Sequence, residues 1–483
     1  MTTSTIIIGS SVHELRALPA GSVDLIVTSS PFQGVREYLP ANHPLKAFEI
    51  GRAATPGEFV GELLDVVDAC AHALSPHGSL VWELGDSMAG SGGAGGDYYN
   101  DDGQRAGQPK PAGSAKLARG RSDPETQRRP QVPAMRRSSP HYRAGTQRWD
   151  KRDGILRGSD TTTYELLPRS GDGWPLDKSH AMIPEMLRMA MAYGQQPFSD
   201  RQCERWIIRN VLRWCKPNPS VGEECDKFRR ATTDMLVATR SELRYWDRLG
   251  ARGPAREGGD ATAPLYDWWE LPTGNYQGAH FATWPLDLVA PLIASMCPHR
   301  VCTTCGEPSR RIMRTSDDYT EQREPGDMFA GLTGENDRGS GRNGATSQGR
   351  GRMVAAEYET LGWTWCGHGG AAHQLDVASK AEWIDAGKPR WPQVLIGETK
   401  VGRWRPGSGC ETGDPSSGRR GMVLDPFAGT GSTLAAANGA GRDAIGIELL
   451  DDHAALAVER IGPLFLTTVH GAATQALLEQ APA

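Results

Sequence analysis

A buried strand, a glycine-rich loop, a helix and a second buried strand follow one another in the C-terminal part of the chain. The strands are predicted at Met422–Leu424 and Ala444–Ile447, and the helix at Leu434–Ala440. The loop 425–433 has the sequence DPFAGTGST, and its glycines allow tight turns and the close approach of a ligand. Glu448 ends the second strand, where a carboxylate can accept hydrogen bonds from both hydroxyls of a ribose. The whole unit predicts a site for a cofactor that contains a nucleoside, whereas such glycines alone often only pack a helix against a strand.

Strands and helices also alternate near the start of the chain. Apolar and β-branched runs predict strands at residues 5–8, 23–28 and 79–84, a 3.6-residue period predicts a helix at 57–74, and a turn is predicted at 76–78. This alternation is typical of a parallel α/β sheet. The second strand ends in Ser29-Ser30-Pro31-Phe32, at the sheet edge where open α/β sheets bind ligands. Taken alone, this tetrapeptide is more typical of a turn with a buried phenylalanine.

Long stretches rich in glycine, arginine, serine and proline separate the ordered patterns. They cover residues 89–175, 317–354 and 400–420 in a chain that has 58 Gly and 33 Pro and is only 38 % hydrophobic. Such composition predicts loops or insertions, flexible at least without their ligand. The remaining predicted elements are a helix at Ile183–Tyr193, strands at Trp206–Trp214 and Asp234–Thr239, and a helix at Ala454–Ile461.

The charge of the chain is unevenly distributed. Residues 91–160 contain 14 Lys and Arg against 8 Asp and Glu, which is a net charge of +6. Because the whole chain carries −5, the remainder carries −11. The basic segment can contact phosphates and gain affinity by releasing counterions, although a solvated linker has the same composition.

The sequence lacks the usual signals for membranes and export. No apolar run approaches the ~18 residues that a membrane helix needs, and the first residues lack the basic region of a signal peptide. Nine cysteines, an odd number scattered along the chain, are typical of a reducing compartment. These features predict a cytoplasmic protein without a membrane partner.

Three motifs occur in a distinctive order along the chain. Ser29–Phe32 is similar to [DNS]-P-P-[YFW], His280–Pro285 to H-x-A-x-[FW]-P, and residues 425–433 to D-P-F-x-G-x-G-[ST]-[ST]. In content and order they resemble the S-adenosylmethionine-dependent DNA amino-methyltransferases, in the permuted β-type group of the N4-cytosine/N6-adenine family. The similarity covers roughly residues 1–88, 176–300 and 420–465.

The resemblance implies a Rossmann-like α/β methyltransferase fold with a seven-stranded, mixed but mainly parallel sheet and a circularly permuted motif order. The strand at Ile6–Ile8 is then expected beside the strand that ends in Glu448. The core is expected in three parts: the catalytic half at 1–88, a part with the second cofactor segment at 176–296, and the cofactor half at 421–483. Two regions are expected between them. One is a basic Gly/Arg-rich insertion at 89–175, and the other, at 297–420, has a Cys/His knuckle and flexible insertions suited to target recognition.

The resemblance also implies the site residues. The expected catalytic residues are Ser29, Ser30, Pro31 and Phe32, and the expected S-adenosylmethionine-binding residues are Asp425, Pro426, Phe427, Gly429, Gly431, Thr433, Glu448, Phe281 and Thr283. The Ser29 hydroxyl and the Ser30 carbonyl would accept the two N–H bonds of an exocyclic amine on a base taken out of the duplex. Phe32 would stack on that base.

Ser29 indicates which base is modified. Family members with serine at this position usually methylate N4 of cytosine, whereas Asp or Asn usually accompanies N6 of adenine, so cytosine N4 is expected and adenine N6 is the alternative. Ser30 departs from the family because it replaces a proline and loses a fixed φ near −65°. The sequence alone therefore predicts that Ser30→Pro keeps or raises the methylation rate. Ser10 stands where many members carry an acid that touches the adenine of the cofactor, and both departures leave open a catalytically impaired DNA-binding relative.

A cysteine cluster lies between the two cofactor segments. Cys302 and Cys305 form a C-x-x-C knuckle, and Cys366 and His368 follow after a long loop. Thiolate pairs at this spacing suit tetrahedral zinc, so a structural zinc site is predicted on these four residues, with Cys297 as a substitute ligand. Buried free thiols and a redox pair are the alternatives.

Double-stranded DNA is the partner that the resemblance implies. The sequence fits a protein with a restriction endonuclease partner and equally a protein without one. An oxidoreductase that binds a dinucleotide at residues 425–433 is the alternative class of enzyme. That alternative leaves Ser29–Phe32 and His280–Pro285 unexplained, and the loop does not have the G-x-G-x-x-G pattern of dinucleotide sites.

Overall fold

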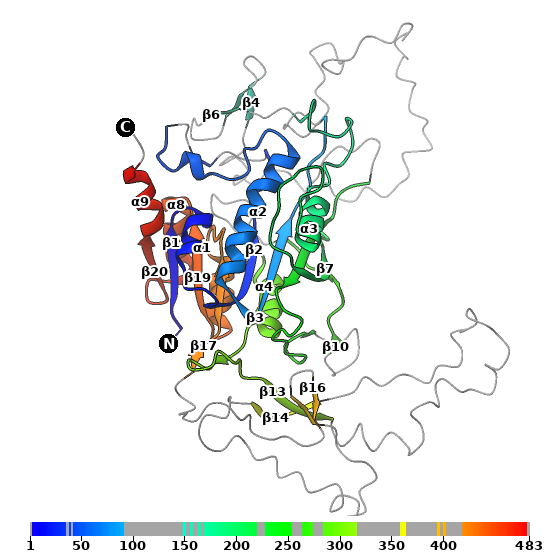
Figure 1. Cartoon of the computed structure of the whole chain (residues 1–483), viewed down its shortest axis with the longest axis vertical. Helices are drawn as coiled ribbons and strands as arrows, with labels where there is room; N and C mark the ends of the chain where they lie inside the picture. Colours follow the sequence, from blue (N-terminus) through cyan, green and yellow to red (C-terminus); the bar gives the residue numbers. More distant parts are fainter. Residues whose placement is uncertain are drawn as a thin grey trace, which may run out of the picture.

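A nine-stranded sheet forms the centre of the computed structural model, in the order β11-β7-β8-β3-β2-β18-β19-β1-β20 (Figure 1). The structure describes residues 2–34, 38–39, 42–90, 148–150, 155–157, 163–165, 169–219, 228–253, 263–273, 284–315, 358–363, 394–396, 399–401 and 418–480. The strands of this sheet are β1 (Ser4–Ile8), β2 (Val23–Ser29), β3 (Leu74–Leu84), β7 (Ile207–Cys215), β8 (Thr232–Thr239), β11 (Trp268–Glu270), β18 (Met422–Asp425), β19 (Asp443–Glu448) and β20 (Leu466–His470).

Neighbouring strands are parallel except at β8, which runs antiparallel to both β3 and β7. The prediction of a mixed, mainly parallel sheet is therefore confirmed. The predicted count of seven strands is wrong, because β11 and β20 extend the two edges. β11 has only three residues, and four of the five side chains of β20 are exposed, so neither strand has the apolar run that marks a buried strand.

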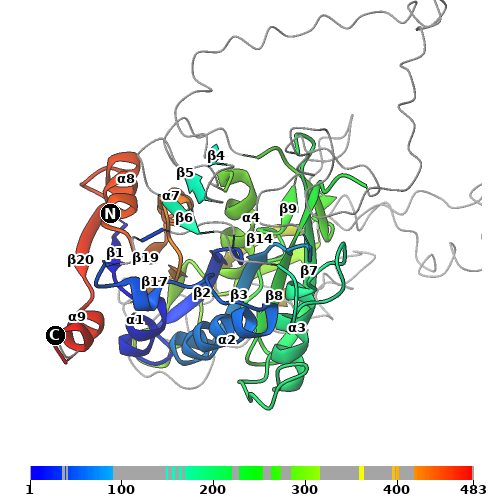
Figure 2. The same cartoon turned by 90° about the horizontal axis from the view of Figure 1, so that it is seen from above.

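Helices cover both faces of the sheet (Figure 2). Among the described helices, three pack on each face: α1 (Ser11–Ala17), α2 (Pro56–Ala73) and α3 (Ile183–Tyr193) on one, and α4 (Leu286–Met296), α7 (Ser432–Gly439) and α8 (Asp451–Ile461) on the other. The start of α2 is fixed by a capping box, in which Thr55 Oγ1 accepts the Glu58 N–H and the Glu58 carboxylate accepts the Thr55 N–H. The chain thus forms a three-layer α/β core.

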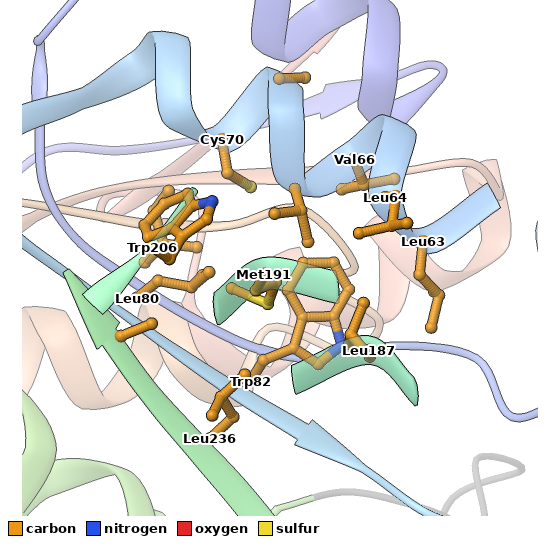
Figure 3. Packing of buried hydrophobic residues seen from close by; sticks show 14 of the residues in the cluster. Leu63, Leu64, Val66, Cys70, Leu80, Trp82, Leu187, Met191, Trp206 and Leu236 are labelled. Carbon is orange, nitrogen blue, oxygen red and sulfur yellow. The ribbon is translucent and has the colours of Figure 1, made fainter. Parts of the chain in front are cut away.

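The central strands are apolar on both sides because helices cover both faces. In β2, every residue from Val23 to Thr28 is buried. On one face, Leu64 of α2 and Met191 of α3 belong to the same cluster as Leu80 and Trp82 of β3 (Figure 3). This packing fixes the position of β3 beside the end of β2.

The N-terminal strand β1 lies between two strands from the other end of the chain, β19 and β20. Ile8 pairs with Glu448 in parallel register, which confirms that the Ile6–Ile8 strand lies beside the strand of Glu448. On its other side β19 pairs with β18, and β18 pairs with β2. The strand ends at Ser29, Asp425 and Glu448 therefore share one edge of the sheet.

The predicted turn at 76–78 is wrong, since these residues lie inside β3. The His77 carbonyl accepts the Tyr245 N–H at 2.8 Å, and His77 Nε2 lies 2.9 Å from Asp24 Oδ1. These contacts hold the segment extended, and the pairing of β2 with β3 shifts register between Val23 and Leu25 instead.

Smaller antiparallel sheets lie outside the central sheet. Their strands are β4 (Arg148–Asp150), β5 (Ile155–Arg157) and β6 (Thr163–Glu165); β13 (Arg311–Thr315), β14 (Tyr358–Trp363), β15 (Val394–Ile396) and β16 (Thr399–Val401); β9 (Arg252–Gly253) with β10 (Ala263–Pro264); and β12 (Arg300–Val301) with β17 (Arg419–Arg420). The remaining helices in the described part of the chain are the 3₁₀ helix Lys46–Phe48 and α9 (Ala472–Gln480). Across the described residues, no helix is both long and apolar enough to cross a bilayer.

Candidate active site

A cavity of about 320 Å³ lies at the carboxyl ends of β2, β18 and β19. This is the edge at which parallel α/β sheets bind ligands. Ten of the predicted site residues line the cavity: Ser29, Ser30, Pro31, Phe32, Asp425, Pro426, Phe427, Gly429, Thr433 and Glu448. The structure thus brings the predicted catalytic tetrapeptide and most of the predicted cofactor loop to one place.

Three predicted cofactor residues are not among the lining residues. Phe281 and Thr283 lie outside the described residues. Gly431 is described, and its backbone has a φ of +75°. A Cβ at this position would come within 3.0 Å of both Ala457 and Ile461 on α8. Gly431 therefore serves the turn and the close packing of the loop on α8, and it does not line the cavity.

Asp425 holds the cofactor loop from inside. Its Oδ1 accepts hydrogen bonds from Thr28 Oγ1 at 2.7 Å and from the Phe427 N–H at 3.0 Å, and its Oδ2 accepts one from Thr433 Oγ1 at 2.6 Å. Burial raises the pKa of Asp425 to about 6, against the lowering effect of these donors. The carboxylate thereby joins the end of β2 to the start of α7.

Glu448 organises the opposite side of the loop. Its Oε2 accepts the Gly429 N–H at 2.7 Å, and its Oε1 accepts the N–H groups of Leu449 and Leu450, both at 3.0 Å. His453 Nδ1 lies 3.4 Å from the same Oε1. Because each carboxylate oxygen has two acceptor sites, Oε2 retains one for a ligand hydroxyl in the cavity.

Ser29 donates its hydroxyl proton to a buried carboxylate. Ser29 Oγ lies 2.5 Å from Glu83 Oε2, and Glu83 is 3 % exposed. Burial raises the pKa of Glu83, whereas the Ser29 hydroxyl, the Lys216 ammonium and the Thr233 hydroxyl lower it. Lys216 Nζ donates to Thr233 Oγ1 at 2.5 Å. Because the Ser29 hydroxyl donates its hydrogen bond to Glu83, the lone pairs of Ser29 Oγ are left for a donor in the cavity.

Two more residues of the predicted catalytic tetrapeptide are held from the side of β3: Ser30 by β3 itself, and Phe32 by Gly85, which follows the end of β3. Ser30 Oγ accepts the indole N–H of Trp82 at 3.0 Å. The Phe32 ring lies directly on Gly85, because a Cβ at Gly85 would come within 2.9 Å of Phe32 Cε2. Glycine at position 85 therefore leaves the space in which the Phe32 ring sits at the cavity wall.

Sequence reasoning missed several residues of this site. Glu83 could have been found because it is the one acidic residue in the otherwise apolar run Leu80–Leu84. A charge that is buried in a strand needs a partner, which marks such a residue as a candidate for the site. Ser10 is buried with its hydroxyl 2.8 Å from His13 Nδ1, and its neighbour Ser11 lines the cavity instead. Other lining residues that no motif marked are Tyr38, Phe48, Trp284 and His453.

The predicted zinc ligands are only partly described. Cys366 and His368 lie outside the described residues, whereas Cys302 is half-buried and Cys305 is exposed. Within the described ranges, no group of three or more His, Cys, Asp or Glu side chains is placed to hold a metal ion. Zinc binding by the four predicted residues stays a prediction.

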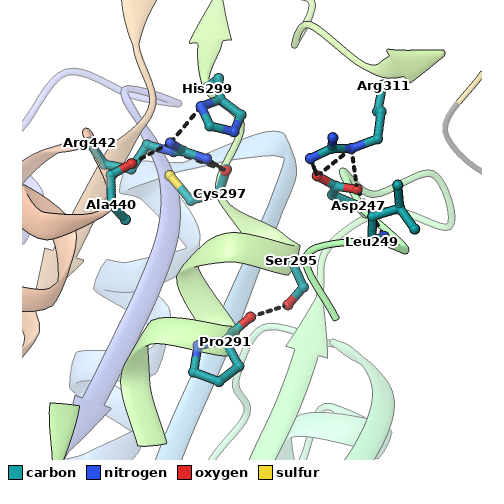
Figure 4. A network of polar contacts seen from close by, with 9 residues as sticks. All are labelled: Asp247, Leu249, Pro291, Ser295, Cys297, His299, Arg311, Ala440 and Arg442. Carbon is teal, nitrogen blue, oxygen red and sulfur yellow. Dashed lines mark hydrogen bonds and ion pairs between the residues drawn. The ribbon is translucent and has the colours of Figure 1, made fainter. Parts of the chain in front are cut away.

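Cys297, the predicted substitute ligand, belongs to a different polar network (Figure 4). Arg442 donates to the Cys297 carbonyl from Nε at 3.2 Å and to His299 Nδ1 at 2.8 Å. Burial raises the pKa of the Cys297 thiol, whereas zinc binds the thiolate. Burial, together with Arg442, lowers the pKa of His299 to about 4. The network fastens the end of α4 to the residues just before β19, so Cys297 has a structural role.

Comparisons of the sequence with known proteins agree with the motifs. A family model described as DNA methylase (N6_N4_Mtase) matches residues 414–459. Type II methyltransferase M.XycI of Xanthomonas campestris pv. cyanopsidis is 25 % identical over 290 residues, which cover 60 % of this chain and 71 % of that protein. Type II methyltransferase M.Cfr9I of Citrobacter freundii is 24 % identical with the same coverage. The solved PvuII DNA methyltransferase (cytosine-N4-specific) aligns over 99 % of this chain and 93 % of its own, at 11 % identity and a TM-score of 0.40.

The matched segment is the part of the chain that surrounds the cavity from the cofactor side. It contains both the loop 425–433 and Glu448. The residues Ser29–Phe32, which resemble the catalytic tetrapeptide of the same family, line the other side of the same cavity. The family match, the type II methyltransferase relatives and these motifs together support an amino-methyltransferase of the N6/N4 DNA methylase family.

Proposed function

We propose that the protein transfers a methyl group from S-adenosylmethionine to the exocyclic N4 of a cytosine in double-stranded DNA. The observation that carries this proposal is the Ser29 hydroxyl, which donates to Glu83 in a cavity shared with the cofactor loop. In the family that the chain resembles, serine at this position usually accompanies cytosine N4. The arrangement leaves Ser29 as a hydrogen-bond acceptor for an amine.

The cavity has the chemistry to hold S-adenosylmethionine, which supplies an electrophilic methyl group on a positively charged sulfur when bound. Glu448 Oε2 has an acceptor site for a ribose hydroxyl, and Phe427, Ile447 and Trp284 provide apolar surface. The volume of about 320 Å³ falls within the ~300–1,000 Å³ that is typical of small-molecule sites.

The catalytic tetrapeptide orients the target amine. A cytosine amine is a weak nucleophile because its lone pair is delocalised into the ring. Ser29 Oγ and the Ser30 carbonyl accept its two N–H bonds, which favours a pyramidal nitrogen whose lone pair faces the methyl group. Phe32 stacks on the base, whose extrusion from the duplex requires a few kcal/mol. Alignment of the two reactants supplies much of the rate.

The remaining parts of the chain are assigned by the same proposal. The order of the catalytic and cofactor segments is the permuted one, and the insertion 89–175 and the region 297–420 contribute DNA contacts and target recognition. The basic segment 91–160 contacts phosphates, so that DNA affinity falls as the salt concentration rises.

Base-resolved sequencing of DNA from cells that express the chain tests the function. N4-methylcytosine at a fixed sequence is the expected mark, and N6-methyladenine in its place would assign the alternative base. Absence of any mark while the purified protein binds S-adenosylmethionine would identify a catalytically impaired relative. Phe32→Ala is expected to abolish the mark, because it removes the stacking surface for the base. Phe198→Ala is the matched control, since Phe198 is fully exposed, and it is expected to leave the mark intact.

The rate of methyl transfer should fall at acidic pH as Glu83 becomes protonated. Burial raises the pKa of Glu83, so its carboxylate is lost at a higher pH than that of an ordinary glutamate. A protonated Glu83 no longer accepts the hydrogen bond of the Ser29 hydroxyl. It then also cannot accept the Ser29 proton while Ser29 Oγ takes up the proton that the methylated nitrogen must lose. We expect an acid limb in the single-turnover rate, and Glu83→Gln should remove this limb and lower the plateau about 10–100-fold.

Asp425 also titrates near pH 6, and the two effects are separable. Asp425 anchors the cofactor loop, so its protonation should weaken S-adenosylmethionine binding, whereas Glu83 acts on the rate at saturating cofactor. The profile is therefore measured from pH 5 to 9 with saturating S-adenosylmethionine and DNA. An acid limb that is identical in the Glu83→Gln variant would contradict the assignment to Glu83.

A further inference from the structure

Two successive residues of β3 hold the two serines that end β2 and begin the catalytic loop. Glu83 accepts the Ser29 hydroxyl, and Trp82 donates its indole N–H to Ser30 Oγ at 3.0 Å. Trp82 is 1 % exposed and Ser30 is 3 % exposed, so water does not compete for this bond. An indole N–H is a donor without an acceptor function and needs a partner when it is buried. Ser30 is the partner that the structure provides.

The Trp82 ring also contacts the cofactor loop. Its centroid lies 6.0 Å from that of Phe427, with an interplanar angle of 70°, which is an edge-to-face arrangement. Phe427 lines the cavity, and its N–H donates to Asp425. One buried side chain therefore contacts both halves of the site, through its nitrogen on the catalytic side and through its ring on the cofactor side.

We propose that Trp82 is a positioning residue that couples the catalytic loop to the cofactor loop through Ser30 and Phe427. The inference rests on the proposed function and adds to it a residue that touches neither the base nor the cofactor. Trp82 is itself fixed by the packing of α2 and α3 against β3 (Figure 3). A shift of either loop is thereby transmitted to the other, which keeps the amine and the methyl group in line.

The hydrogen bond from Trp82 to Ser30 also explains why a serine can stand at position 30, where the family that the chain resembles has proline. Proline would restrict φ of the loop, whereas the Trp82 bond restricts the Ser30 side chain. Ser30→Pro removes the acceptor and leaves a buried indole N–H without a partner. The structure therefore reverses the expectation from the sequence, and Ser30→Pro should lower the rate about tenfold in the presence of Trp82.

The experiment is a double-mutant cycle on the full-length chain. Single-turnover rates at saturating ligands are compared for the wild type, Ser30→Ala, Trp82→Phe and the double variant. Each single change is expected to lower the rate about tenfold, and the double variant should be no slower, because both changes remove the same bond. Ser30→Pro should be slow alone and faster in the Trp82→Phe background, which has no N–H to satisfy. Multiplicative losses in the double variant, or a wild-type rate for Ser30→Pro, would overturn the proposal.

Trp206→Phe is the matched control for loss of a buried tryptophan. Trp206 is 4 % exposed, belongs to the same core cluster, and its Nε1 has no hydrogen-bond partner within the described structure. Its substitution should change the thermal midpoint as much as Trp82→Phe does and leave the rate unchanged. A rate loss equal to that of Trp82→Phe would show that the effect is only structural.

The cofactor side is measured without methyl transfer. Ser30→Ala should raise the Kd for S-adenosylmethionine about threefold when Trp82 is present and not in the Trp82→Phe background, because the effect passes through the indole. Equal effects in both backgrounds would refute the coupling even if the protein transferred no methyl group. An inactive wild type that still showed this dependence would refute only the proposed function.

Discussion

Ser29→Ala is expected to lower the rate constant of methyl transfer about 100–1,000-fold while the Kd for S-adenosylmethionine stays within twofold. Removal of one preorganised hydrogen-bond partner at a reacting centre typically has an effect of this size. The variant also leaves the buried Glu83 without the hydroxyl that lies 2.5 Å from its Oε2. Single-turnover kinetics and equilibrium binding of the cofactor measure the two quantities separately.

The control for this prediction is Ser199→Ala. Ser199 is exposed and its hydroxyl accepts only a local bond from the Arg201 N–H among the described residues, so its loss should change neither quantity. If Ser29→Ala retained more than a third of the wild-type rate, the assignment of Ser29 as the acceptor of the target amine would be wrong.

Glu448→Gln is expected to weaken S-adenosylmethionine binding at least 100-fold. The amide of glutamine has an NH₂ donor where the carboxylate has its second oxygen. In one orientation this NH₂ faces the N–H of Gly429, and in the other it faces the N–H groups of Leu449 and Leu450, so two donors meet in either case. A mispaired buried donor costs about 1–3 kcal/mol, and the acceptor for a ribose hydroxyl is lost or displaced as well. Calorimetric titration with S-adenosylmethionine measures the change.

Asp452→Asn is the matched control, because Asp452 lies four residues away on the exposed face of α8 and bears the same charge. It should leave the affinity unchanged at moderate salt. Should Glu448→Gln bind the cofactor as tightly as the wild type, the cofactor would lie elsewhere in the cavity.

The position of the site could be predicted from the sequence because it depends on local patterns. An apolar run followed by Ser29–Phe32 or by the loop 425–433 places these segments at strand ends, and parallel strands bring their ends to one edge. The pairing of β1 with the strand of Glu448 followed from the motif order. These features need only the order of elements along the chain.

The contacts behind the catalytic loop could not be predicted in the same way. The bonds Ser29–Glu83 and Ser30–Trp82 join residues more than 50 positions apart, and their geometry depends on the register of β2 against β3. The packing of Gly431 on α8 could not be predicted either, because a glycine that packs against a helix and a glycine that admits a ligand look the same in a sequence. The edge strand β20 was missed since its side chains are mostly exposed.

The position of β1 between β19 and β20 has a consequence for synthesis on the ribosome. Ser4 pairs with Ala444 on one side and with Leu466 on the other, so β1 waits for partner strands that are made about 440 residues later. At about 5–20 residues per second, that interval lasts roughly 20–90 s. During this time the apolar residues Ile6 and Ile8 have no sheet to join, and closing so long a loop is slow. Strand β1 is therefore exposed to chaperones and proteases until β19 and β20 emerge.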